Sequence, residues 1–299
     1  MMRYFNIVPD QMFSLFFLAV ELFNPNISQS HFNPDYTFKL NKTTTVFREP
    51  LHIIQLTATI VCRLSAQNVY VTCVLRDIMY ESFLKYITLN EPTYIAREII
   101  PDENNKDWFR IKFNNTGVEK ILVSRACDKR DIIKEIASQF NMGNELNLRE
   151  SSRFWDDQFE AKETTLAGRC NTRYMIRMRG KENERQDTHF RVVFPDINFE
   201  ETKYVEIEKI RSKCEYSKGF FDFLNGLEVT QYSHSMKVFD DQFQISTIMN
   251  VELPADPWNE KYKRVFKETT LLNLTNVEPQ HSNNLRTPYN NFWTDTLRL

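Results

Sequence analysis

Glycine is scarce in this sequence, and its scarcity excludes several classes of nucleotide-binding protein. The 299 residues contain 6 glycines, all of them isolated from one another. A phosphate-binding loop or a dinucleotide-binding turn needs several backbone amides exposed by closely spaced glycines. The sequence therefore excludes P-loop NTPases and Rossmann-type dinucleotide-binding domains.

Standard catalytic and metal-binding patterns are also missing. No GxSxG, HExxH or DxDxDG pattern occurs, and no nucleophile accompanies the acidic clusters. The five histidines are dispersed, without the i, i+2 or i, i+4 spacing that is typical of metal ligands; they are His31, His52, His189, His234 and His281. We predict a protein that is not an enzyme and that has no catalytic residue, metal site or cofactor.

Charge of one sign is not in excess, because 38 basic and 40 acidic residues give a net charge of -2. Such a balance gives no reason to expect nucleic acid as a partner. An electrostatic partner must be bound by a local patch. Arg173, Arg177 and Arg179 share one parity of a predicted strand, and further basic residues follow at Lys181, Arg185 and Arg191. The common interpretation is a solvated strand face, and the functional one is a docking patch for a receptor.

No apolar run is long enough to span a bilayer, so no transmembrane segment is predicted. The run from Met12 to Phe23 has the length of the apolar region of a signal peptide. Ser28 and Ser30 have the small side chains that a signal peptidase accepts. We predict a signal peptide over residues 1–30 and a secreted, extracellular mature chain; the alternative is a buried N-terminal element.

Glycosylation acceptors agree with secretion. The sequence has acceptor triplets at Asn41 (NKT), Asn114 (NNT) and Asn273 (NLT). Each triplet alone is a weak signal, since such triplets arise by chance. We predict a secreted glycoprotein from their agreement with the signal peptide and the cysteines.

Strand patterns dominate from residue 36 onward. Segments rich in Thr, Val, Ile and aromatic residues alternate in part with period two and are separated by polar turns. They are Tyr36–Phe47, Leu51–Leu64, Val69–Ile78, Trp108–Phe113, Val118–Val123, Asn171–Met178, His189–Phe194, Lys203–Ile210, Val229–Phe239, Phe243–Leu253 and Tyr262–Leu274.

One segment, Asp128 to Phe140, predicts a helix, with an apolar stripe that includes Ile133, Ile136 and Ala137. Residues 141–167 read as a polar loop with a short helical turn around Phe154 to Phe159. The pattern predicts a mainly β protein, an antiparallel β-barrel wrapped around an α-helix. The barrel domain is expected to cover 31–278, followed by a polar tail over 279–299.

The five cysteines suggest two bridges and one free thiol. Cys62 and Cys73 lie at equal distance from a predicted turn at residues 67–68, so a two-residue hairpin brings them face to face. A slip of one residue in register separates them. Cys170 and Cys214 then remain as candidates for the second bridge, with Cys127 free at the start of the helix.

The order of several segments resembles the N-terminal domain of vitellogenins, in the large lipid-transfer protein family. The resemblance rests on a YTFKL opening strand, a WFRIKFNNTGVEKILV hairpin that leads into a DIIKEIASQF helix, a LAGRCNTRYMI strand and a later IRSKCEYSKG segment. It spans roughly Pro34 to Glu278 and implies the same β-barrel around a helix. It also implies a bridge from Cys170 to Cys214.

In full-length members of that family, a helical arch and the sheets that enclose the lipid cavity follow this domain, and the present sequence stops before them. The resemblance implies a secreted, non-enzymatic vitellogenin-like module in lipid or yolk transport. Its expected partner is a lipoprotein particle or a lipoprotein receptor of the low-density lipoprotein receptor class, bound through the basic patch. The alternative is a small carrier that binds a hydrophobic ligand itself, at a barrel mouth or an outer groove, because the helix stripe fills the interior.

Overall fold

The computed structural model describes residues 19–22, 34–64, 70–86, 93–100, 107–114, 116–144, 155–180, 190–193, 202–238, 242–253, 263–278 and 295–299. The strands are β1 (Ala19–Leu22), β2 (Asp35–Val46), β3 (Leu51–Leu64), β4 (Tyr70–Lys85), β5 (Thr93–Ile100), β6 (Trp108–Asn114), β7 (Gly117–Val123), β8 (Trp155–Thr164), β9 (Gly168–Gly180), β10 (Phe190–Val193), β11 (Thr202–Tyr216), β12 (Glu228–Val238), β13 (Phe243–Leu253), β14 (Lys263–Glu278) and β15 (Asp295–Leu297). The helices are α1 (Arg130–Gln139) and α2 (Lys218–Leu224).

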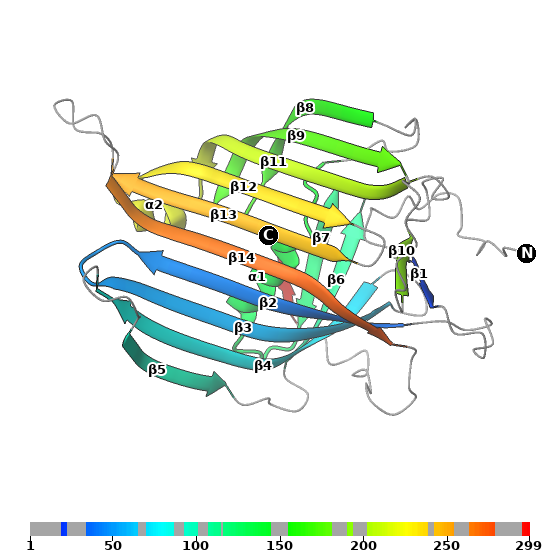
Figure 1. Ribbon diagram of the computed structural model, residues 1–299, viewed down its shortest axis with the longest axis horizontal. Helices are drawn as coiled ribbons and strands as arrows, with labels where there is room; N and C mark the ends of the chain where they lie inside the picture. The colour runs from blue at the N-terminus through cyan, green and yellow to red at the C-terminus, as the bar shows by residue number, and fades with distance from the viewer. Residues whose placement is uncertain are drawn as a thin grey trace, which may run out of the picture.

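Nearly all of these strands belong to one antiparallel sheet. Its strands follow the order β15-β7-β6-β4-β3-β2-β14-β13-β12-β11-β9-β8, and β5 pairs with β4 beside this path. Figure 1 shows the long strands from β8 at the top to β5 at the bottom. The prediction of a mainly antiparallel β protein is confirmed.

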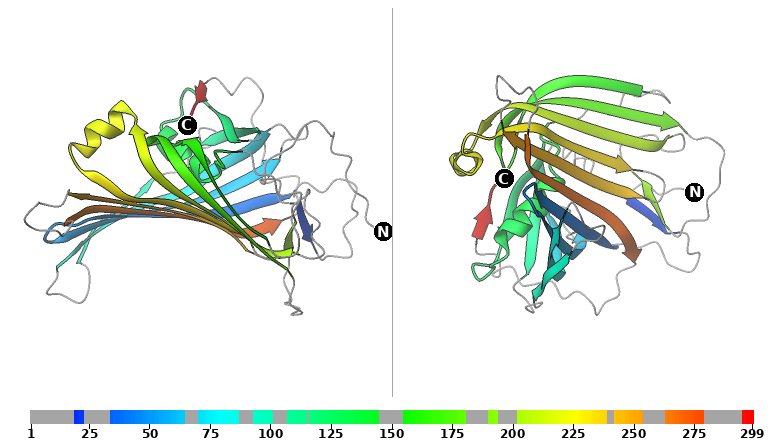
Figure 2. Two further views of the ribbon diagram at one scale, coloured as in Figure 1. Left: turned by 90° about the horizontal axis from the view of Figure 1, so that it is seen from above. Right: turned by 60° about the vertical axis from the view of Figure 1, so that its left-hand side comes forward.

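The closed barrel is not confirmed, because the sheet is an open, strongly curved trough (Figure 2). In the described part of the chain, β8 and β15 end the path and do not pair with each other. The sheet also branches within β4, which changes partner along its length: Tyr70 to Val74 pair with β6, whereas Ile78 to Leu84 pair with β5. A bulge at Asp77, with a φ of 50°, separates the two stretches. Among the described strands, β5, β8 and β15 are therefore edge strands, and a closed barrel has none.

The helix α1 packs on the concave face of the trough. Its Ile133, Ile136 and Ala137 are fully buried in the same core as the inner-face residues of the sheet. Phe140, just after the helix, meets Phe38 of β2 edge to face, with ring centroids 5.5 Å apart. Burying an isoleucine side chain contributes roughly 1.5–3 kcal/mol, so this stripe holds the helix in place.

The helix is shorter than the predicted segment 128–140. Its N-cap residue is Lys129, which makes no side-chain capping bond. Lys129 instead reaches back to Asp107, the residue before β6, where its Nζ lies 2.6 Å from the carboxylate in a buried ion pair. This contact fixes the start of the helix to the sheet.

Two elements differ from the prediction. Residues 155–164, expected to be part of a loop with a helical turn, form the edge strand β8. Its inward positions carry Asp157, Phe159, Ala161 and Glu163, so the apolar alternation that marks a half-buried strand is weak. The helix α2 was not predicted, and its short apolar segment has no helical period to reveal it.

Some predictions lie wholly or partly outside the described residues. Within the predicted signal peptide only 19–22 are described, and they pair with β10 as strand β1. Within the predicted polar tail, β15 pairs with β7, and Leu297 is buried in the core. No helix in the described ranges combines the length and apolarity needed to cross a membrane.

Candidate functional site on the concave face

A row of polar side chains crosses the floor of the trough beside α1. In sheet register, Lys209 of β11 lies opposite His234 of β12, His234 opposite Thr247 of β13, and Thr247 opposite Thr270 of β14. Thr270 in turn lies opposite Lys42 of β2. These positions all face the helix, and we call the row the polar belt. It separates the apolar floor under α1 from the open end of the trough.

At one end of the polar belt, a buried carboxylate bridges two buried cations. The Glu163 side chain accepts hydrogen bonds from Lys209 Nζ at 2.7 Å and from Arg211 Nε and Nη2 at 2.8 and 3.0 Å. Thr172 Oγ1 donates a further bond to it at 3.2 Å. We call these the Glu163 cluster, which joins β8, β9 and β11.

Electrostatics in the Glu163 cluster follow from one carboxylate facing two cations. Burial raises the pKa of Glu163, but Lys209 and Arg211 outweigh burial and lower it to about 2. Burial, with Arg211 in support, lowers the pKa of Lys209 to about 8 against the attraction of Glu163. The cluster carries one excess positive charge when all three groups are ionised.

The Glu163 cluster holds the segment that leaves α1. Lys209 Nζ donates to the carbonyl oxygen of Asn141 at 2.6 Å, and the hydroxyl of Tyr174 donates to that of Met142 at 3.1 Å. Gly143 has a φ of 75° and lies against Glu163 so closely that a Cβ atom there would overlap its side chain. Every charge has a partner within the protein, so this cluster is structural and offers no free acid or base.

At the other end of the polar belt, α1 is tied to the sheet by a second ionic group. Lys42 Nζ lies 2.8 Å from Glu135 of the helix and 2.9 Å from Glu268 of β14. Burial and then Glu135 raise the pKa of Glu268, and Lys42 opposes them. Thr270 Oγ1 donates to Glu135 at 3.2 Å. The helix is therefore anchored at both ends of the belt.

Between these two groups lies a short chain of hydrogen bonds. Thr247 Oγ1 is 3.0 Å from His234 Nδ1 and donates to Gln139 Oε1 of α1 at 2.7 Å. His234 is 2% exposed, and its Nε2 is buried without a hydrogen-bond partner. Burial, Lys209 and Arg211 lower the pKa of His234 well below its usual value, so the imidazole is neutral at physiological pH.

A pocket of about 170 Å³ lies over the centre of the polar belt. It is bounded by the last turn of α1, strands β11 to β14, the turn at residues 165–167 and the start of α2. Its polar wall includes His234, Gln139 and Arg211, and its apolar wall includes Phe220, Met249 and Leu299. Most of its lining residues are polar or charged, including the ion-paired Lys42, Glu135 and Glu268.

Beyond the pocket, aromatic side chains line the open end of the trough. Phe223 of α2 meets Phe266 of β14 edge to face, at 6.0 Å between ring centroids. Phe221 and Phe223 are 66% and 57% exposed. Figure 2 shows α2 at the rim of the trough. We call Phe221, Phe223 and Phe266 the aromatic rim.

The predicted basic patch is only partly described, and its arginines face the outer side of the sheet. Lys181 and Arg185 lie outside the described residues, and at Arg179 and Arg191 the structure describes the strand backbone alone. Arg173 is exposed. Arg177 Nη1 lies 3.0 Å from Glu206 and 3.9 Å from Glu208, both on β11.

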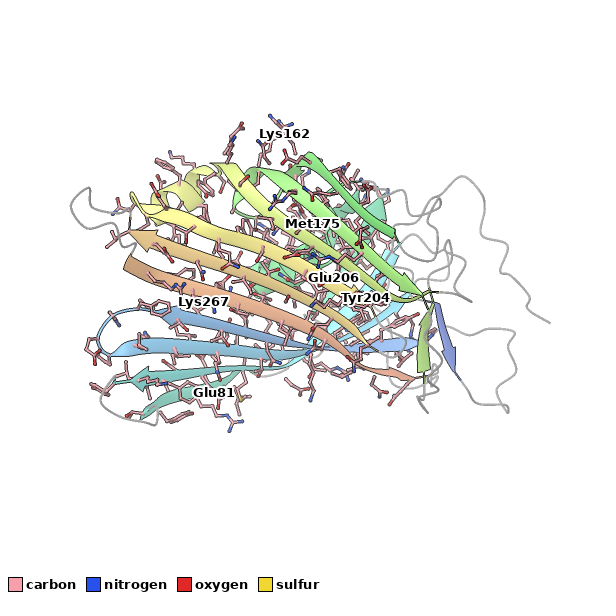
Figure 3. The ribbon with its side chains drawn as sticks, turned by 45° about the horizontal axis from the view of Figure 1, so that its top comes forward. Glu81, Lys162, Met175, Tyr204, Glu206 and Lys267 are labelled. Carbon is pink, nitrogen blue, oxygen red and sulfur yellow. A yellow bond between two sulfur atoms is a disulfide. The ribbon has the colours of Figure 1, made fainter. Side chains whose placement is uncertain are left out.

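Acidic groups therefore share the outer face with the arginines. Glu206 also pairs with Lys237 at 3.0 Å and accepts a hydrogen bond from the Tyr204 hydroxyl at 2.6 Å. Figure 3 shows Tyr204 and Glu206 next to each other on this face, with Met175 on β9 nearby. Receptor binding here stays a prediction.

Both cysteine pairs expected from the sequence are disulfides in the structure. Cys62 and Cys73 face each other in the β3–β4 register, and Cys170 is joined to Cys214. A bulge in β11, with a φ of 48° at Lys213, interrupts the register where Cys214 faces Cys170. Cys127 is free and buried, and burial raises the pKa of its thiol.

The predicted glycosylation acceptors differ in exposure. Asn41 on β2 and Asn114 at the β6–β7 turn are exposed. Asn273 is half-buried on β14 and accepts a hydrogen bond from Gln244 at 3.1 Å. In the described ranges, no group of three His, Cys, Asp or Glu side chains is arranged to hold a metal ion.

The polar belt was not predicted from the sequence. One signal was present in β11, where Lys209 and Arg211 have the same parity as the buried Val205 and Ile207. Two charges on the inward parity of a strand need a buried partner. Their partner, Glu163, lies on a strand that was not predicted, so the cluster was not recognised.

Comparison with solved structures finds that this fold is similar to that of lipovitellin. The chain is similar to a solved structure that describes lipid–protein interactions in lipovitellin, with a TM-score of 0.53 and 12% sequence identity. The match covers 85% of this chain and 26% of that chain, so this chain spans about a quarter of the lipovitellin chain. No family model and no curated protein matches the sequence. The likeness shows a lipovitellin-like fold.

Proposed function

We propose that the protein is a secreted, non-enzymatic module of lipid transport that docks on the surface of a lipoprotein particle. The docking surface is the open end of the trough, with the aromatic rim in contact with lipid. The observation that carries this proposal is the exposure of Phe221 and Phe223 on α2, beside the exposed Lys218. Exposed aromatic side chains flanked by a basic residue are typical of segments that enter a lipid interface.

The geometry favours docking over the enclosure of bulk lipid. The pocket beside α1 holds about 170 Å³, whereas pockets that enclose even a drug-sized molecule usually measure about 300–1,000 Å³. The lipovitellin-like fold supports a role in lipid transport, because the lipovitellin structure was described for its lipid–protein interactions. The two disulfides support secretion, since such bonds persist in oxidising compartments.

Flotation with phospholipid-coated triacylglycerol emulsion particles tests the docking proposal. The wild-type chain should float with the particles, and Phe221→Ser with Phe223→Ser should bind at least about tenfold more weakly, because two apolar side chains no longer enter the lipid. The matched control is Arg173→Ser with Arg177→Ser on the outer face, which should float like the wild type. Loss of flotation in the control, with retention in the α2 variant, would place docking on the outer face instead.

A direct carrier role is the second candidate function. It is favoured by the pocket over the polar belt, which has an apolar wall of Phe220, Met249 and Leu299 facing polar side chains. Its size limits such a role to one small ligand, or to the head of a longer one.

A further inference from the structure

We propose that a groove on the outer face of the sheet holds the first sugars of an N-linked glycan attached to Asn41. These sugars are N-acetylglucosamine units, and they cover the exposed apolar strand β5. The inference rests on the secretion in the proposed function, but it does not depend on docking to a particle.

The groove crosses four strands on the side of the sheet opposite α1, and it measures about 470 Å³. In sheet register, Asn41 of β2 lies opposite Thr57 of β3, and Thr57 lies opposite Met79 of β4. Met79 in turn lies opposite Ile99 of β5. All four residues line the groove. Because Leu40, next to Asn41, is buried in the core with α1, this row faces outward.

Asn41 is open to modification in the folded protein. Its side chain is exposed, and among the described residues no hydrogen bond engages it. Thr43, which completes the acceptor triplet, has the same parity on β2 and lies on the same face. Lys42, between them, points to the polar belt and pairs with Glu135. A sugar on Asn41 Nδ2 therefore displaces no contact of the protein.

The other two acceptor asparagines have different surroundings. Asn114 Oδ1 accepts hydrogen bonds from the Thr116 backbone N–H at 3.0 Å and from the Thr116 hydroxyl at 2.9 Å, in an exposed turn. Asn273 is half-buried and bonded to Gln244. Neither of them lines the groove. Asn114 is thus a comparison site, exposed but outside the groove.

The lining of the groove suits N-acetylglucosamine, which has hydroxyl groups at its rim, apolar C–H faces and an acetyl methyl group. Thr57 and Thr59 supply hydroxyl groups, and Lys39 supplies an ammonium donor. Met79 and Ile99 supply apolar surface. Pockets of about 300–1,000 Å³ hold drug-sized molecules, so one or two sugar rings fit the volume.

Charges in the groove nearly balance, as suits a neutral sugar. The charged lining residues are Lys39, Arg97 and Asp77. Arg97 Nε is engaged by Met79 Sδ at 2.9 Å and lies 3.8 Å from Glu81 on the same face. Lys39 and Asp77, of opposite charge, can each form hydrogen bonds with sugar hydroxyl groups.

A glycan in this position covers the apolar surface of β5. Neighbouring strands lie about 4.8 Å apart, so about 14 Å separates Asn41 from Ile99. Two sugar rings on an asparagine side chain extend over this distance. Ile99 is 64% exposed, and Tyr94 and Ile95 are exposed beside it. An exposed apolar edge strand favours pairing with other chains, and sugars over its outer face hinder such pairing.

Secretory expression of the full chain behind an added signal peptide tests the site. Entry into the pathway then does not depend on residues 1–30. Glycopeptide mass spectrometry should find a glycan on Asn41. Removing it, by peptide-N-glycosidase or as Asn41→Gln, should speed hydrogen exchange in residues 93–100 by about fivefold, in line with the loss of one hydrogen bond. It should also shift the methyl resonance of Met79.

The matched control is Asn114→Gln, which removes a glycan outside the groove. Hydrogen exchange in β5 and the Met79 resonance should both stay as in the glycosylated wild type. Flotation of Asn41→Gln with emulsion particles should also match the wild type, because the aromatic rim lies elsewhere.

Two results would overturn the inference. One is a secreted chain in which Asn41 carries no glycan. The other is a glycan on Asn41 whose removal changes neither the exchange of β5 nor the Met79 resonance. Failure of residues 1–30 to direct secretion by themselves would contradict the proposed function, while the result from the added signal peptide still decides the Asn41 site.

Discussion

At the scale of single residues, the feature that matters most for stability is a set of buried charges on the inward face of the sheet. Glu163, Lys209 and Arg211 are almost completely buried, and Glu163 pairs with both cations. The burial of apolar side chains and of the paired cysteines was predictable from the sequence. The Ile stripe of α1 and the opposed Cys62 and Cys73 are examples. The ion-pair partners of buried charges were not predictable, because they come from strands that are far apart in the sequence.

Glu163→Gln should destabilise the protein by about 3–5 kcal/mol, because it leaves two buried cations without their carboxylate. Urea unfolding measures the change. The matched control is Glu160→Gln, on the exposed face of the same strand, which should change stability by less than about 0.5 kcal/mol. Equal effects of the two substitutions would show that the cluster is not buried as described.

Acid should remove stability in a window set by Glu163. Its pKa is about 2 in the folded protein against an ordinary value of 4.5. A depressed carboxyl pKa contributes stability above the unfolded value, and this contribution is lost as the pH falls from about 4.5 towards 2. The loss amounts to about 3 kcal/mol. The free energy of unfolding, measured at several pH values in this range, should fall more steeply with decreasing pH for the wild type than for Glu163→Gln. Equal slopes for the two proteins would assign the acid sensitivity to other groups.

At the scale of elements, the sequence predicted the long alternating strands and the α1 stripe. Strands β12 and β13, for example, lie within one residue of the predicted segments. The strand β8 was missed because Asp157 and Glu163 interrupt its inward apolar pattern. Closure of the sheet was predicted wrongly, because pairing between the end strands β8 and β15 is a matter of tertiary structure that no local pattern encodes.

The turn after α1 depends on Gly143, and Gly143→Ala should destabilise the protein by about 2 kcal/mol or more. An alanine there has a positive φ and overlaps Glu163. Gly219→Ala in α2 is the control, because a Cβ atom there meets nothing within 4 Å. Its helix position predicts a gain of about 0.5–1 kcal/mol. Thermal unfolding compares the two, and a neutral Gly143→Ala would contradict the tight contact with Glu163.

The two disulfides should contribute unequally to stability. The bridge from Cys170 to Cys214 spans 44 residues and that from Cys62 to Cys73 spans 11. The chain-entropy estimate gives about 4 and about 3 kcal/mol, respectively. Denaturation of the two double alanine variants measures the difference, and a larger loss without the shorter bridge would contradict the entropic account.

At the scale of the whole molecule, the protein is an open trough that exposes one end of its concave face. The helix α1 covers the apolar floor of the trough, and the polar belt marks the boundary of this covered part. The aromatic rim lies at the edge of the uncovered, open end. The sequence resemblance to the vitellogenin N-terminal domain agrees with the lipovitellin-like fold. The aromatic rim was not predicted, because its residues come together only when α2 packs beside β14.

Hydrogen–deuterium exchange with and without phospholipid-coated emulsion particles tests the central claim most directly. The account predicts that particles slow exchange in residues 217–227, around α2. The edge strand β5 (Thr93–Ile100), whose residues are mostly exposed and which pairs only with β4 in the described part of the chain, should stay unchanged. Particle binding that leaves α2 exchanging at its original rate would contradict docking through the open end of the trough.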